Sequence, residues 1–80
     1  RILSNDEYIA ALEAKLNEEV AEYQADKNLE EMADVLEVLQ AICTARGYSL
    51  EELELTREKK AQKRGGFKEK IFLEYVEEKM

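Results

Sequence analysis

The residues of this chain best suited to chemistry are two acidic pairs, Glu19 with Glu22 and Glu31 with Asp34. The members of each pair are three residues apart, a spacing that places two side chains on one face of a helix. Four converging carboxylates would repel one another, and a hard cation such as Mg²⁺ or Mn²⁺, which prefers oxygen ligands, would relieve that repulsion. Because the chain has no histidine, the sequence favours an all-carboxylate magnesium site.

The same acids also have an ordinary structural explanation. Glu31 comes three residues after Asn28, where it can serve as a helix-capping partner. Glu22 can form a surface ion pair with Lys15 or Lys27. From the residues alone, a metal site and a set of solvated helix charges remain open alternatives.

A cationic face follows further along the chain. Arg57, Lys60 and Arg64 recur at i, i+3 and i+7, which is one face of a helix. The residues beside them are Lys59, Lys63, Gly65 and Gly66. Arginine and lysine neutralise phosphate charge and glycine lets a backbone approach closely, so this face suits a polyphosphate. The alternative is a solvated helix end whose cations interact favourably with the helix dipole.

Helices must position these side chains, and the sequence marks where they begin and end. The chain has no proline, and three polar residues followed three positions later by Glu have the capping-box pattern. These three are Ser4, Asn28 and Ser49. The glycines are typical helix stops. We therefore expect an all-α chain with helices near 5–25, 28–46 and 49–64. The short turn between the first two makes them an antiparallel hairpin.

On the first predicted helix, one acid lies among the apolar residues. The apolar stripe consists of Ile9, Leu12, Leu16, Val20 and Tyr23. At about 100° per residue, Glu19 falls roughly 20° from Leu12 and points with the core, whereas Glu22 borders the same face. A carboxylate on an apolar face is costly unless something pairs with it.

The second predicted helix is apolar over a wider arc, which includes Glu31 and has Asp34 on its flank. Its apolar residues are Leu29, Met32, Val35, Leu36, Val38, Leu39, Ala41, Ile42 and Ala45. Such a helix contacts neighbours on two sides, and a chain this short buries only about 60% of its unfolded surface. We therefore expect an oligomer.

Beyond the helices, residues 70–76 are rich in β-branched and aromatic types. This composition predicts a short strand or extended tail. Residues 1–3 can pair with it. The 80 residues make one domain, 1–80, and the absence of an initiator Met leads us to expect a missing N-terminal segment.

Composition excludes several classes of function. The 19 acidic and 12 basic residues give a net charge of −7, which argues against binding nucleic acid or an anionic membrane through bulk charge. The single cysteine, Cys43, excludes an internal disulfide and fits a cytoplasmic protein. No apolar run approaches the roughly 20 residues that span a bilayer.

The acidic pairs resemble a family signature. Glu18-Glu19-Val20-Ala21-Glu22 followed by Glu30-Glu31-Met32-Ala33-Asp34 is similar to the Glu-x-x-Glu…Glu-x-x-Asp pattern of the all-α nucleoside triphosphate pyrophosphohydrolases, which include the MazG-like and phosphoribosyl-ATP pyrophosphohydrolase-like proteins. Lys60-x-x-x-Arg64-Gly65-Gly66-Phe67 resembles the basic tail of smaller members. The resemblance covers roughly residues 3–76.

This resemblance implies a dimer or tetramer in which protomers combine their helices into four-helix bundles. It implies that Glu19, Glu22, Glu31 and Asp34 bind Mg²⁺, and that the enzyme cleaves a nucleoside triphosphate into a nucleoside monophosphate and pyrophosphate. Glu22 or Glu31 would activate water, and the face of Arg57, Lys60 and Arg64 would bind the leaving pyrophosphate. Tyr23 would either stack on a base or belong to the core.

The chain departs from the family pattern in one spacing, because only eight residues separate Glu22 from Glu31, and this shorter spacing would shrink a base pocket. Two other functions remain open. One is hydrolysis of phosphoribosyl-ATP, and the other is a non-catalytic helical association module that keeps its acids for solubility.

Overall fold

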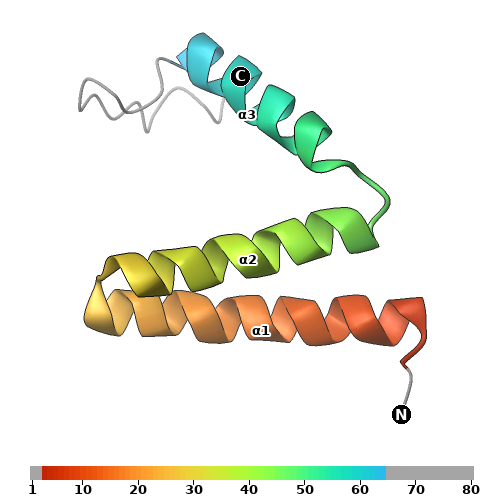
Figure 1. Ribbon diagram of the computed structural model, residues 1–80, viewed down its shortest axis with the longest axis vertical. Helices are drawn as coiled ribbons and strands as arrows, with labels where there is room; N and C mark the ends of the chain where they lie inside the picture. The colour runs from red at the N-terminus through yellow and green to blue at the C-terminus, as the bar shows by residue number, and fades with distance from the viewer. Residues whose placement is uncertain (1–2, 65–80) are drawn as a thin grey trace. The chain divides into compact units, whose positions relative to one another are not determined.

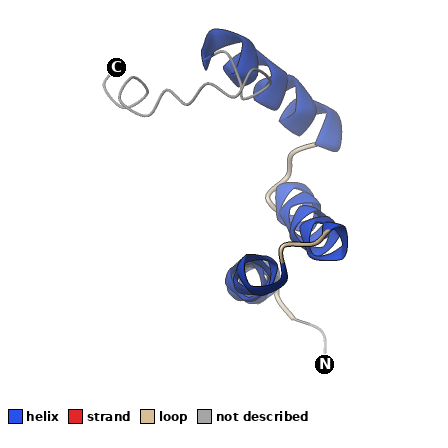
Figure 2. Cartoon of the chain, turned by 90° about the vertical axis from the view of Figure 1, so that its left-hand side faces the viewer, coloured by secondary structure: helices blue, strands red, loops and turns tan. Residues whose placement is uncertain are grey.

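The computed structural model describes residues 3–64 of the chain, which form three helices (Figure 1). They are α1 (Asn5–Asp26), α2 (Leu29–Ala45) and α3 (Leu50–Arg64). The all-α prediction is confirmed, with each helix end within one residue of its expected place. No strand occurs among the described residues (Figure 2). The predicted extended segment at 70–76, its pairing with residues 1–3 and the glycine stop at 65–66 lie outside them.

The helix starts depend on local hydrogen bonds. At α1 the capping box is complete, because Ser4 Oγ accepts from the backbone N–H of Glu7 at 3.2 Å and Glu7 Oε1 accepts from the N–H of Ser4 at 3.0 Å. At α2, Asn28 Oδ1 accepts from the N–H of Glu31 at 2.8 Å. The Glu31 side chain does not complete that box, since its Oε1 is buried without a hydrogen-bond partner. The carboxylate of Glu31 is thus left for another role.

A tight turn joins α1 to α2. Lys27 ends α1 in the left-handed conformation, with φ 56°, and its N–H donates to the carbonyl of Tyr23 at 2.7 Å. Asn28 then caps the next helix, so the two helices run antiparallel, side by side (Figure 1). The hairpin brings residues of α1 opposite residues of α2 that follow them closely in sequence.

Packing between α1 and α2 buries few side chains. Val38 and Cys43 are the buried apolar residues in the described part of the chain, and no side chain there is less than 2% exposed. Near the open end of the hairpin, Arg46 Nη2 donates to Glu13 Oε2 at 2.7 Å and ties the two helices together. One copy of the hairpin therefore has a thin apolar core.

A stripe of apolar side chains on α2 faces away from this core. Leu29, Met32, Leu36 and Leu39 are 76%, 47%, 53% and 41% exposed. Their spacing of three, four and three residues is that of a helix-packing seam. The wide apolar arc expected of this helix is thus divided into a face packed on α1 and an uncovered face, here called the α2 stripe.

The third helix belongs to a separate compact unit, whose boundary follows Leu50. Within α3, Arg57 is held by Glu54 one turn earlier, with Nε donating to Oε1 at 3.1 Å and Nη2 donating to Oε2. None of the described helices is long and apolar enough to cross a membrane.

Candidate metal centre

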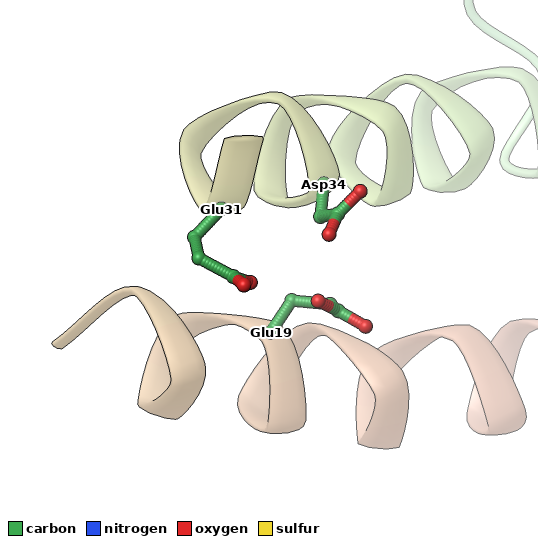
Figure 3. Close-up of side chains that lie close together, drawn as sticks. All are labelled: Glu19, Glu31 and Asp34. Atoms are coloured by element: carbon green, nitrogen blue, oxygen red, sulfur yellow. The ribbon is translucent and has the colours of Figure 1, made fainter. Parts of the chain in front are cut away.

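Three of the four predicted carboxylates meet in the hairpin. Glu19 comes from α1, and Glu31 and Asp34 come from successive turns of α2. One carboxylate oxygen from each lies within 4.8 Å of the others. Figure 3 shows Glu19 directed toward α2, and Glu31 and Asp34 directed toward α1. These three residues are called the acidic cluster below.

Glu19 is the most buried member of the cluster. It is 8% exposed, as expected from its place beside Leu12 on the apolar face of α1. Its Oε2 lies 3.2 Å from Lys15 Nζ, one turn earlier on the same helix. Its Oε1 is buried without a hydrogen-bond partner. An unsatisfied carboxylate oxygen in a buried position is unfavourable, so this oxygen is suited to a ligand.

Glu31 shares this property. It is half-buried, and its Oε1 also lacks a hydrogen-bond partner. Loss of solvent and then repulsion from Glu22, Asp34, Asp26 and Glu19 raise the pKa of Glu31 above its ordinary value. A cation placed among these oxygens would have the opposite effect.

Asp34 lies at the exposed side of the cluster. Solvent exposure therefore increases across the cluster: Glu19 is buried, Glu31 is half-buried and Asp34 is exposed. This gradient leaves the cluster in contact with solvent on one side, where water and a substrate oxygen can complete the coordination of a cation.

Glu22, the fourth predicted ligand, is exposed and lies outside the acidic cluster. Its charge is nevertheless near enough to be the largest electrostatic contribution to the raised pKa of Glu31. Glu22 does not form the predicted ion pair with Lys15 or Lys27. Lys15 contacts Glu18 and Glu19, at 3.1 and 3.2 Å, and Lys27 donates to Gln24 at 2.7 Å.

Two charged residues near the cluster were not assigned to it from the sequence. Lys15 precedes Glu19 by four residues, so the i, i+4 spacing was the available signal. Asp26, whose charge also contributes to the raised pKa of Glu31, ends α1 and gave no signal. Tyr23, a predicted base-stacking or core residue, is half-buried, and Lys27 Nζ lies 5.5 Å from its ring centroid.

The predicted phosphate-binding residues all lie on α3. Arg57 and Lys60 are exposed, and Arg64 is the last residue of the helix. Glu54 competes for the guanidinium of Arg57, and the hydrogen bond between them holds the pKa of Glu54 below its ordinary value. A phosphate bound by Arg57 would have to displace that carboxylate.

Comparison with known proteins leaves the chain without a family assignment, because no family, curated protein or solved structure matches it significantly.

Proposed function

We propose that this protein is a magnesium-dependent nucleoside triphosphate pyrophosphohydrolase, with Mn²⁺ able to replace Mg²⁺. The observation that carries the proposal is the buried Oε1 of Glu19, which has no hydrogen-bond partner although its carboxylate lies beside Glu31 and Asp34. A protein gains nothing in stability from such an arrangement, because it desolvates like charges beside one another.

The donor set fits a small hard cation. It consists entirely of carboxylates, the ligand type that Mg²⁺ and Mn²⁺ prefer. Oxygens on one octahedral Mg²⁺ are about 3–4 Å apart, given Mg–O distances of about 2.0–2.1 Å. The oxygens of the cluster, which lie within 4.8 Å of one another, would therefore move closer together around the cation. Glu19, Glu31 and Asp34 would hold the cation, with Glu22 beside them as a fourth acid.

The proposed reaction is attack of water on the α-phosphorus of a nucleoside triphosphate. The bond from that phosphorus to the bridging oxygen breaks, and the products are a nucleoside monophosphate and pyrophosphate. When bound, Mg²⁺ would neutralise the negative charge of the phosphates and lower the pKa of a water molecule. Glu22 or Glu31 accepts the proton of the attacking water. On α3, Arg57, Lys60 and Arg64 are the proposed pyrophosphate-binding residues.

A pyrophosphate-release screen over nucleoside triphosphates, with Mg²⁺ or Mn²⁺, tests this function. Equal amounts of pyrophosphate and monophosphate are expected, with ¹⁸O from labelled water in the monophosphate. Glu19→Gln should abolish release, whereas the matched control Glu30→Gln, an exposed acid of α2 outside the cluster, should not. Release of orthophosphate in place of pyrophosphate would contradict the assignment. Phosphoribosyl-ATP belongs in the same screen, because it tests the related hydrolase.

A second copy of the chain is the proposed partner of the α2 stripe. The stripe is free of charged residues, it has seam spacing, and the hairpin beneath it has a thin core. A homodimer or homotetramer would cover it and complete a four-helix bundle. The same stripe favours the alternative function of a helical association module, which would bind no nucleotide.

A further inference from the structure

The two oxygens of the Glu19 carboxylate have different surroundings. Oε2 lies 3.2 Å from the ammonium of Lys15, and Oε1 is buried without a partner. The side chain of Lys15 is 52% exposed, whereas that of Glu19 is 10% exposed. Lys15 therefore reaches from the surface of α1 to one side of a buried carboxylate.

This difference matters for the way in which Glu19 can bind a cation. A carboxylate with both oxygens available can bind with two, a mode common for Ca²⁺, which takes six to eight ligands at about 2.3–2.6 Å. Mg²⁺ requires nearly ideal octahedral geometry at about 2.0–2.1 Å. An ammonium on Oε2 leaves one oxygen for the cation and so disfavours the two-oxygen mode.

We propose that Lys15 is a positioning residue that holds Glu19 to one-oxygen coordination and thereby makes the acidic cluster select Mg²⁺ and Mn²⁺ over Ca²⁺. The inference rests on the proposed metal site and adds the source of its selectivity. Residues that hydrogen-bond a metal ligand often fix its orientation in this way.

The side chain of Lys15 is charged where it contacts Glu19. An ordinary lysine has a pKa of about 10.4, so the ammonium that contacts Glu18 and Glu19 is protonated at neutral pH. Removing Lys15 leaves the buried carboxylate of Glu19 without its ion-pair partner, so circular dichroism must first show that Lys15→Met and Lys15→Ala are folded. The effect of the substitution can then be measured on metal binding itself.

The test is calorimetric titration of the full chain with Mg²⁺, Mn²⁺ and Ca²⁺ separately. Lys15→Met and Lys15→Ala should raise the affinity for Ca²⁺ relative to Mg²⁺ by about ten-fold or more, the lower end of effects seen for residues that orient metal ligands. Loss of a nearby positive charge strengthens binding of both cations and cancels in the ratio. Lys15→Arg should restore the wild-type ratio.

Glu18→Gln is the matched control, because it breaks the 3.1 Å contact of Lys15 with Glu18 and retains the contact with Glu19. Its ratio of Ca²⁺ to Mg²⁺ affinity should equal that of the wild type. An unchanged ratio in both Lys15→Met and Lys15→Ala overturns the role of Lys15 and leaves the metal site standing. Absence of Mg²⁺ and Mn²⁺ binding to the wild-type protein overturns the metal site and this inference together.

Discussion

Glu19 and Glu31 lie on opposite helices of the hairpin, and each buries one carboxylate oxygen that has no hydrogen-bond partner (Figure 3). Both residues belong to the acidic cluster, with one oxygen of each within 4.8 Å of the other. Two like charges in this position oppose folding unless protons or a cation neutralise them. The predictions on the cluster follow from this relationship.

Glu19→Gln should abolish binding of Mn²⁺, as measured by calorimetry. Because the substitution removes a buried charge, the free energy of unfolding should stay unchanged or rise by about 1 kcal/mol. Asp34→Asn should also abolish binding, with a smaller effect on stability, since Asp34 is exposed. Glu30→Gln is the control and should retain binding. If Glu19→Gln unfolds the chain, the main role of Glu19 is its ion pair with Lys15.

The pH dependence of stability should carry the signature of Glu31. Its pKa is raised in the folded chain, so the folded state binds the proton more tightly than the unfolded state. The free energy of unfolding should therefore fall as the pH rises from the unfolded pKa of Glu31 through its folded pKa. Urea denaturation between pH 3 and 7, a range chosen to bracket an ordinary Glu pKa of about 4.3, checks this. Glu31→Gln should flatten the profile, and a profile identical to wild type would contradict the prediction.

Lys60→Ala should weaken binding of a nucleoside triphosphate about ten- to a hundred-fold, since a charge-assisted contact contributes roughly 1.5–3 kcal/mol. Arg64→Ala should act similarly. A monophosphate should be affected less, because only the triphosphate carries the leaving pyrophosphate. Stability should change by no more than about 1 kcal/mol. Lys59→Ala, on another face of α3, is the control. If the affinities for monophosphate and triphosphate fall equally, this face of α3 does not bind the leaving pyrophosphate.

Leu36→Asp should dissociate the proposed homodimer or homotetramer. Leu36 is 53% exposed in one chain and lies in the middle of the α2 stripe, so an added charge costs nothing in a monomer and disrupts a covered seam. Light scattering at micromolar concentration measures the change in mass. The control is Ala21→Asp, which adds the same charge at an exposed position of α1. A folded wild-type monomer at that concentration would show that no second copy covers the stripe.

Lys27→Gly should stabilise the hairpin by about 0.5–1 kcal/mol, because Lys27 has φ 56° and glycine adopts this left-handed conformation without a steric penalty. Lys27→Ala keeps the strain, loses the hydrogen bond to Gln24, and should be less stable than wild type. Urea midpoints compare the three chains. A glycine variant weaker than wild type would mean that the contacts of Lys27 with Gln24 and Tyr23 contribute more than the strain.

The sequence by itself determined the helices, because their signals are local. Ser4 and Asn28 cap the helices that follow them through bonds to residues three positions later. The apolar period did not decide which face α2 buries, because Leu29, Met32, Leu36 and Leu39 of its predicted apolar arc are exposed. The sequence also determined that Glu31 and Asp34 share a face, since both belong to one helix.

Only the tertiary structure decided which acids meet. Whether Glu19 or Glu22 lies opposite Glu31 depends on the rotation of α1 about its axis and on the register of α1 against α2. In the hairpin Val38 is buried and Arg46 pairs with Glu13, and such contacts between the helices join residues distant in sequence. In this structure Glu31 does not complete a capping box, and the α2 stripe is exposed. Spacing along a helix specifies the face of a side chain, whereas its neighbours across the hairpin depend on how two faces dock.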